Sequence, residues 1–393
     1  MCPPLSLEKQ SLLDCTVDIE AASVVTTTTM IIVALYVLSG CSQPILMTVL
    51  RQAGLADSNC QVYMLFYYLG TASAIFTLPH ASQWPSKRTM AKAAGIALWD
   101  ICAQTMNYTG AALTGPTIFA IIYASVTIWA AIYSQVFLGR RMNTFQWCAV
   151  ILVFGGLALT ANDSVETGST GIIHGLILVV AGSSMHGLFY VMSEAVMTTG
   201  TSPQERLTVP QNCAVQGMTA SACFAVWQFL YTLPHFEARL LEPMQTAGTS
   251  LLQALFLLVI FGAVSFVHSI TFYHTLRHLP GGSTSAGVFK GLQAVLVFVF
   301  THAIFCHRVG GPEMCFTQIK LFSLVTVAGG VAWYGHATSK IKQHITHTSS
   351  STLQSKMKLR DGGSYHSIMQ QETTVIEIEP IASTVDATRQ PQG

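Results

Sequence analysis

Charged residues are scarce in this chain. Asp, Glu, Lys and Arg make up 9% of its 393 residues, whereas a soluble domain has about a quarter. This scarcity excludes a soluble globular protein. The 19 basic residues are balanced by 18 acidic ones, and no run is strongly basic, which excludes a nucleic-acid binder. The ten cysteines are dispersed through a long chain, so a disulfide scaffold is also excluded.

Motifs for nucleotide hydrolysis and metal binding are missing as well. No Gly-x4-Gly-Lys-Ser/Thr sequence occurs, which excludes a built-in ATPase. No His-x3-His or Cys-x2-Cys spacing falls within an apolar stretch, so no metal site is expected there. No His/Asp/Ser constellation singles itself out as an intramembrane active site. We therefore expect neither an enzyme nor a cofactor.

Long uncharged stretches are what the chain does have, and they mark membrane spans. About 20 apolar residues let a helix cross the hydrocarbon core of about 30 Å, and alternation typical of strands is absent. The uncharged stretch from Ile101 to Gly139 is too long for one span, and Thr114-Gly115-Pro116 divides it. The pattern predicts an all-α membrane protein with ten transmembrane helices, over residues 24–48, 61–79, 93–112, 116–138, 144–161, 171–193, 212–233, 251–276, 283–305 and 320–338.

The positions of Lys and Arg predict that both termini are cytosolic. The acidic first twenty residues do not fit a cleavable signal peptide, so residues 1–23 are expected to form a cytosolic tail. The loops that then face the cytosol are richer in basic residues than the others, as the positive-inside rule requires. Their basic residues, with those just after the last span, are Lys87, Arg88, Lys92, Arg140, Arg141, Arg206, Arg277, Lys340 and Lys342; the opposite loops hold Arg51, Arg239, Arg308 and Lys320. Residues 339–393 are polar and predict a disordered cytosolic tail.

Two segments of the chain are similar to each other. Residues 115–157 and 282–331 both begin with Gly, run through an apolar span to a loop with an Arg, re-enter the membrane through Phe and Gln, and reach a Gly-Gly pair. A repeat of five helices inverts the second copy relative to the first, an architecture common in transporters. The sequence predicts two inverted five-helix repeats, residues 24–162 and 171–338. Coincidental similarity of two apolar segments is the alternative.

The stretch from Leu98 to Thr160 resembles the third to fifth helices of the drug/metabolite transporter superfamily. Leu98-Trp99-Asp100, Leu138-Gly139-Arg140-Arg141 and Gln146-Trp147 carry that resemblance. The pattern is most similar to the F-type members of solute carrier family 35 and to chloroquine-resistance-transporter-like proteins. The resemblance implies a ten-helix fold and solute transport by alternating access, without specifying one substrate. Val288-Phe289-Lys290-Gly291-Leu292 is similar to the Lys-bearing ninth helix of nucleotide-sugar transporters, but Gly291 stands where phosphate-carrying relatives have a second basic residue.

Ionisable residues within the spans are the first candidates for a substrate site, because each is costly at membrane depth. Asp100, Gln104 and Asn107 share one face of a helix; they either line the substrate path or cross-link helices by hydrogen bonds. Lys290 and Gln293 share a face of the ninth span. Lys290 could bind an anionic group, pair with Asp100, or extend its ammonium to the headgroups.

Histidines and further polar residues complete the candidate cavity. His186, Tyr190 and Glu194 follow one another at four-residue intervals; a His–Glu chain could couple transport to protons, or the His could simply pack between helices. Pro44 is expected to break the first helix and free a carbonyl. The other candidates for substrate binding are Gln43, Tyr123, Thr127, His268 and Tyr273.

Short motifs in the tails suggest sorting by cytosolic adaptors. Glu8, Leu12 and Leu13 have acidic dileucine spacing, and Tyr365 and Ile368 fit a tyrosine-based pattern. They favour an endolysosomal or vacuolar membrane, with Golgi and plasma membrane as alternatives. Cys306 and Cys315 could form a disulfide in the last luminal loop or remain free thiols.

The sequence thus predicts a secondary transporter of a small polar organic solute. Protons are the candidate coupling ion. The expected partners are that solute, the lipid bilayer and sorting adaptors, with no nucleic acid, and the chain would act as a monomer or homodimer. A Golgi nucleotide-sugar antiporter and a non-transporting membrane receptor or scaffold are the competing interpretations.

Overall fold

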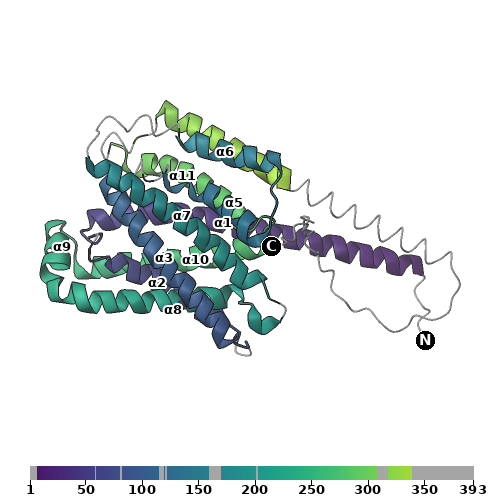
Figure 1. The fold of residues 1–393 in the computed structure, drawn as a ribbon, viewed down its shortest axis with the longest axis horizontal. Helices are drawn as coiled ribbons and strands as arrows, with labels where there is room; N and C mark the ends of the chain where they lie inside the picture. The colour runs from purple at the N-terminus through teal and green to yellow at the C-terminus, as the bar shows by residue number, and fades with distance from the viewer. Residues whose placement is uncertain are drawn as a thin grey trace, which may run out of the picture. The chain divides into compact units, whose positions relative to one another are not determined.

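The computed structural model describes residues 7–57, 59–79, 82–114, 119, 122–158, 170–200, 202–307, 315 and 317–338, without the side chains of residues 7–26. Among these residues the ordered elements are helical, and no strand occurs. Figure 1 shows the helices packed side by side. The α-helices are α1 (Leu7–Gln52), α2 (Val62–Ala72), α3 (Lys87–Thr114), α5 (Val126–Leu138), α6 (Thr144–Ala158), α7 (Thr170–Thr198), α8 (Val209–Trp227), α9 (Glu242–Thr246), α10 (Leu251–His278) and α11 (Ser283–Phe305), followed by a helix over residues 318–338.

Helix boundaries follow local chemistry. The Ser250 hydroxyl accepts a hydrogen bond from the backbone N–H of Gln253 and caps α10, and Thr208 caps α8 in the same way. Gly139 ends α5 in the left-handed region with φ 64°. α3 is described up to Thr114, and Gly115-Pro116, predicted to divide this uncharged stretch, lies outside the described residues.

A described helix overlaps each of the ten expected ranges. Five helical segments are long and apolar enough to cross a membrane: Thr27–Gln52, Ile173–Thr198, Val209–His235, Leu251–His278 and Ser283–Phe305. The shorter apolar helices are Val62–Thr77, Val126–Leu138 and Thr144–Gly156. α1 begins at Leu7. Residues 7–23, which were expected to belong to a cytosolic tail, are therefore the first part of this helix. The sorting residues Glu8, Leu12, Leu13, Tyr365 and Ile368, and the tail 339–393, lie outside the described side chains.

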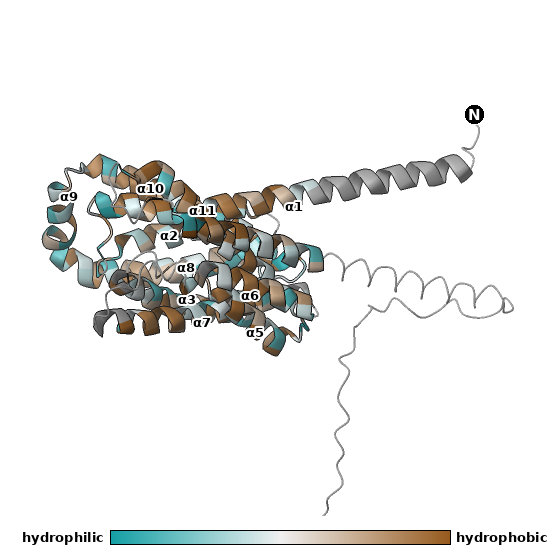
Figure 2. Ribbon diagram, turned by 90° about the horizontal axis from the view of Figure 1, so that it is seen from above, coloured by the Kyte–Doolittle hydropathy of each residue, from teal (hydrophilic) through white to brown (hydrophobic). Residues whose placement is uncertain are grey.

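Apolar side chains cover the outer flanks of the bundle. Figure 2 shows hydrophobic residues along α10, α7 and α11 and a more hydrophilic α9. Large side chains such as Phe137, Phe229, Phe256 and Phe322 are more than half exposed. A contiguous apolar surface of this extent is unfavourable in water and suits lipid. The described part of the chain therefore has the surface of a membrane protein.

The helix contacts form a reciprocal pattern. α1 packs on α10 and α11, while α7 packs on α3 and α5. α2 packs on α10, while α8 packs on α3; α2 also packs on α8, and α5 on α11. Exchanging α1, α2, α3 and α5 with α7, α8, α10 and α11 therefore reproduces these main contacts.

One glycine of each Gly-Gly pair, Gly156 and Gly330, lies where α6 and the helix over residues 318–338 pack against each other. A Cβ at Gly156 would lie 3.0 Å from side-chain atoms of Thr326 and Val327, and one at Gly330 would lie 2.8 Å from Val153. These contacts run antiparallel between α6 and the helix over residues 318–338. Small residues let helices approach closely in membranes.

Gly217 allows the closest approach between α8 and α2, and replacing it is expected to destabilise the bundle. A Cβ there would lie 2.3 Å from the backbone N of Ala72 and 2.6 Å from its Cα. Gly217→Ala should therefore lower stability by about 1–3 kcal/mol, measured as the thermal unfolding midpoint in detergent. Gly329→Ala is the control, because nothing lies within 4 Å of its added Cβ. Equal midpoints for both variants would contradict the close contact.

Candidate functional site

A cavity of about 410 Å³ lies in the centre of the bundle, within the size range of small-molecule sites. Its lining reaches the ends of α1 and α11, at Gln52 and Phe305, and the start of the last helix, at Lys320. At the opposite end of the bundle, Thr198 of α7 and Ser283 of α11 are not among the lining residues. The cavity therefore extends from the middle of the bundle toward one end.

Asp100 of α3 lies at the centre of a hydrogen-bonded group. His186 of α7 places Nδ1 2.9 Å from Oδ1 of Asp100, and the hydroxyl of Tyr68 in α2 donates to Oδ2 at 2.8 Å. All three residues line the cavity and are at least nine-tenths buried. A carboxylate in such a place is stabilised by its donors.

Lys290 of α11 provides a positive charge deep in the cavity. Its Nζ lies 5.8 Å from the centre of the Tyr123 ring, a cation–π distance. Among the described residues no carboxylate lies within the 4.0 Å that defines an ion pair with Lys290. The pairing with Asp100 considered from the sequence is not formed, because His186 and Tyr68 occupy that carboxylate. The amino group of Lys290 therefore remains available to an anionic group in the cavity.

Two amides face the cavity with polar atoms that bond no described residue. They are Nε2 of Gln43 in α1 and Oε1 of Gln293 in α11. The other end of the Gln293 amide donates to the carbonyl of Tyr36 at 2.9 Å, and this bond orients the side chain. A buried donor and acceptor without partners are costly, so both amides suit a polar ligand.

The prediction that the first helix breaks at Pro44 is wrong. α1 continues through Pro44 without interruption, and the carbonyl of Pro44 accepts from the Thr48 hydroxyl at 3.0 Å. Proline removes only its own N–H, which would have bonded the carbonyl of Gly40 one turn earlier. Gly40 lines the cavity, so the carbonyl deprived of its helical donor belongs to a residue of the site although the helix stays whole.

Aromatic rings close the deep end of the cavity. Tyr190 and Phe272 have ring centres 4.6 Å apart, and Phe189 stacks on His186 at 5.1 Å. His268 stacks on Tyr36 at 5.2 Å. Tyr273 donates to Gln216 at 2.8 Å. Of these rings, those of His186, Phe189, Tyr190, His268, Phe272 and Tyr273 line the cavity, and the rings of Tyr190 and Phe272 are tilted by 60° to each other.

Three residues do not have the roles that the sequence predicted for them. Asn107 and Thr127 do not line the cavity: Asn107 fills the space above Gly182 of α7, and Thr127 donates to the carbonyl of Gly287 at 2.7 Å. Helical periodicity gives the face of a residue, but whether a cavity or a neighbouring helix covers that face depends on packing. Glu194 forms no chain with His186; it pairs with Arg140 and accepts from the backbone N–H of Ser283 at 2.7 Å.

The sequence missed α2 and α8 as walls of the cavity. α2 contributes Tyr67, Tyr68 and Thr71, and α8 contributes Gln216 and Gly217. The adjacent tyrosines in an apolar span were the available signal. The other residues predicted to bind substrate line the cavity: Gln43, Asp100, Gln104, Tyr123, His186, Tyr190, His268, Tyr273, Lys290 and Gln293.

Positive charge predominates along the cavity. Arg51, Lys290 and Lys320 line it, whereas Asp100 is its one carboxylate among the described residues. Away from this site, a cluster of His302, Cys306 and Cys315 is the one described group with the composition of a metal site. Cys306 and Cys315 are joined by a disulfide, one of the two states that the sequence left open.

Comparison with known proteins agrees with this geometry. Residues 31–162 match the model of the EamA-like transporter family, a part of the drug/metabolite transporter superfamily. No curated protein matches the sequence. A solved chain titled "Crystal structure of protein" aligns with 80% of this chain and 99% of its own length, with a TM-score of 0.57 and 11% identity; at that identity the likeness concerns the fold alone. Residues 31–162, about a third of the chain, are thus similar to an EamA-like transporter domain, and the described residues form an all-helical bundle.

Proposed function

We propose that this protein is a secondary-active transporter that moves a small polar organic solute by alternating access. The observation that carries the proposal is the central cavity, whose lining reaches one end of the bundle. Toward the other end the lining stops at aromatic rings, and the Arg140–Glu194 pair lies outside the lining. Such a cavity corresponds to one of the two states that alternating access requires. The match of residues 31–162 to a transporter family supports the same function.

Two inverted five-helix repeats, residues 24–162 and 171–338 in ten spans, are the proposed basis of the alternation. The reciprocal helix contacts support this arrangement. So does the antiparallel packing of corresponding helices, such as Tyr68 of α2 on Phe224 of α8 and Thr127 of α5 on Gly287 of α11. Exchange of the conformations of the two halves would open the opposite end.

The proposed orientation places both termini in the cytosol. The Cys306–Cys315 disulfide lies in a loop that this orientation puts on the luminal or extracellular side, where disulfides persist. The cavity then reaches the luminal side, and Arg140 and Glu194 lie on the cytosolic side. An endolysosomal or vacuolar membrane, sorting by adaptors and a monomeric or homodimeric state remain parts of the proposal that rest on the sequence.

The chemistry of the cavity favours a solute with an anionic group and an apolar part. Lys290 supplies the positive charge, Gln43 and Gln293 supply hydrogen bonds, and the rings of Tyr190 and Phe272 supply an apolar aromatic surface. A nucleotide-sugar antiporter is the second candidate, because Lys290 could face the phosphates. One observation against the antiporter is that the residue after Lys290 is Gly291, which is buried and supplies no second charge.

Ligand binding followed by counterflow tests the proposal. The purified protein is screened for thermal stabilisation by nucleotide sugars, amino acids, short peptides, nucleosides, organic anions and cations. Any solute that stabilises it is tested for counterflow in proteoliposomes. We expect Lys290→Ala to raise KM for an anionic solute about tenfold or more, because a hydrogen bond to a charged group contributes about 1.5–3 kcal/mol.

Lys92→Ala is the matched control, since Lys92 lies on α3 but is exposed and does not line the cavity. Stabilisation by nucleotide sugars alone would favour the antiporter. Binding without any counterflow would favour a receptor and contradict the proposed transport. Unchanged KM in Lys290→Ala would remove this lysine from the site.

A further inference from the structure

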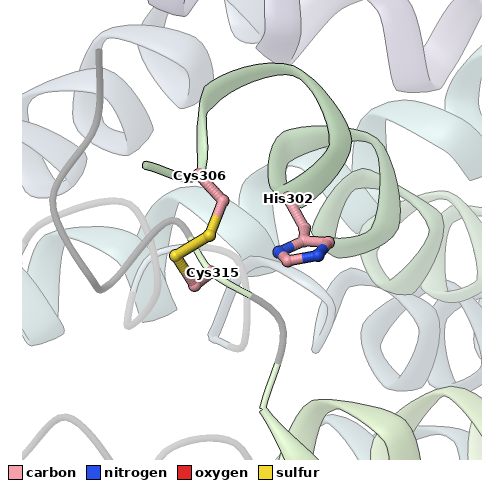
Figure 3. A group of neighbouring side chains, drawn as sticks. All are labelled: His302, Cys306 and Cys315. Carbon is pink, nitrogen blue, oxygen red and sulfur yellow. A yellow bond between two sulfur atoms is a disulfide. The ribbon is translucent and has the colours of Figure 1, made fainter. Parts of the chain in front are cut away.

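Four metal-ligating side chains meet beyond the cavity, where α11 ends. His302 lies in the last turn of α11, and Cys306 follows four residues later, so both project from one side of the helix end. Ligand atoms of His302, Cys306 and Cys315 all lie within 4.8 Å of one another. Figure 3 shows the His302 ring beside the two sulfur atoms. Nε2 of His307 lies 3.8 Å from Sγ of Cys315, which adds a fourth ligand.

The present state of this cluster is a disulfide. Thiolates bind metal ions, and two sulfur atoms bonded to each other no longer have that form. A small dithiol or a dithiol oxidoreductase can change this by exchange: its two thiols become a disulfide, and Cys306 and Cys315 each gain a hydrogen to become thiols. Zn²⁺ can then displace one proton from each thiol and bind the resulting pair of thiolates.

We propose that His302, Cys306, His307 and Cys315 form a zinc site that exists only when the disulfide is reduced. Two thiolates and two imidazoles are a standard ligand set for tetrahedral Zn²⁺, with Zn–S of about 2.3 Å and Zn–N of about 2.0–2.1 Å. These bond lengths put ligand atoms about 3.3–3.8 Å apart. The His307–Cys315 distance already has this value, whereas the two sulfur atoms, now joined in the disulfide, must separate to about 3.8 Å.

The position of the cluster gives the zinc site a link to the cavity. The ammonium of Lys320 donates to the carbonyl of Cys315 at 2.7 Å, and both Lys320 and Phe305 line the cavity. Replacing a disulfide by a metal centre would change the position of Cys315 and hence of its carbonyl. The redox state of Cys306 and Cys315 would thereby change the position of the Lys320 ammonium, a positive charge at the mouth of the cavity.

Cobalt substitution tests the proposal in the full-length protein. The purified chain is either left oxidised or reduced with a water-soluble phosphine, which takes up the oxygen of one water molecule as the disulfide becomes two thiols. Co²⁺ is then added, followed by Zn²⁺. The reduced protein is expected to show the visible and near-ultraviolet bands of a tetrahedral cobalt–thiolate centre, with one ion per chain, and one equivalent of Zn²⁺ should remove them. The oxidised protein should show none.

Histidine variants identify the ligands without preventing disulfide formation during folding. His302→Ala and His307→Ala are each expected to weaken binding about tenfold or more, a loss that even outer-shell partners produce. His235→Ala is the control, because His235 is exposed and bonds the carbonyl of Tyr231 outside the cluster. The described free cysteines are the same in both redox states, so the difference between the two samples isolates Cys306 and Cys315.

Three results would overturn the zinc site. The first is an equal cobalt signal in oxidised and reduced protein. The second is the absence of tetrahedral bands after thiol titration has shown that two new thiols formed. The third is unchanged binding when His302 and His307 are both replaced.

Discussion

Asp100→Asn is expected to abolish uptake driven by a pH gradient while leaving solute exchange measurable. The carboxylate of Asp100 bonds Nδ1 of His186 at 2.9 Å and the hydroxyl of Tyr68 at 2.8 Å. Asparagine has nearly the same size and still accepts a hydrogen bond, but it cannot carry a charge or a proton. In proteoliposomes with an imposed gradient, accumulation of the solute should fall to that of diffusion equilibrium, whereas counterflow without a gradient should continue.

Gln104→Ala is the matched control for this experiment. Gln104 lies one turn from Asp100 on α3 and lines the same cavity, but it does not ionise. Its replacement should change the affinity for the solute and preserve the response to the gradient. If Asp100→Asn accumulates solute as well as the unaltered protein, the Asp100–His186 pair is not the proton carrier.

We propose that the Asp100–His186 pair is the physical basis for coupling to protons, the candidate coupling ion that the sequence suggested. An isolated buried carboxylate would bind a proton to avoid the cost of its charge, and an isolated buried imidazole would lose one. Together they can hold one proton as an ion pair. Movement of α3 against α7, which pack on each other, would separate the two groups, and whichever of them then reached water could exchange this proton with it.

The fold was largely predictable because charges are costly in lipid. The long uncharged stretches marked the helices, and the rare ionisable residues within them, Asp100 and Lys290, lie in the cavity as expected. Gln43 and Gln293 followed the same logic, since an amide in an apolar span needs partners. The energetic cost of a polar group is a property of the residue itself, so the sequence alone reveals it.

The walls formed by apolar and aromatic residues were not predictable in this way. Phe189 and Phe272 face the cavity, whereas Phe229 and Phe256 are exposed on the outer flank, and all four stand in similar apolar sequence. Only the packing of α7 and α10 against their neighbours distinguishes them. The same holds for Asn107, which packs against Gly182 although it shares a helical face with Asp100.

The seal at the end of the bundle opposite the cavity mouth joins residues far apart in sequence. Glu194 at the end of α7 is fully buried and pairs with Arg140, which follows α5. It also accepts from the backbone N–H of Ser283 at the start of α11, at 2.7 Å. Gly282 makes room for this carboxylate, because a Cβ there would overlap its oxygens. One side chain therefore holds three elements together at the end that the proposed orientation places in the cytosol.

Glu194→Gln is expected to open this end more often, and Cys213 can report it. Cys213 lies in the second turn of α8, fully buried in the apolar cluster that includes Leu207. Breaking a buried pair costs about 3–5 kcal/mol, less here because Arg140 is 38% exposed. A loss of about 1.4 kcal/mol already increases the open population tenfold. Modification of Cys213 by a membrane-impermeant maleimide, located by mass spectrometry, should accelerate about tenfold or more.

Cys60 in the same molecule is the internal control. It is buried between α1 and α2 at the other end of the bundle, where burial raises the pKa of its thiol and lowers its reactivity. A general loosening of the fold would expose Cys60 and Cys213 together, whereas release of the seal alone would expose Cys213. Equal modification of Cys213 with and without Glu194 would show that this end is closed by the aromatic rings and not by the Arg140–Glu194 pair.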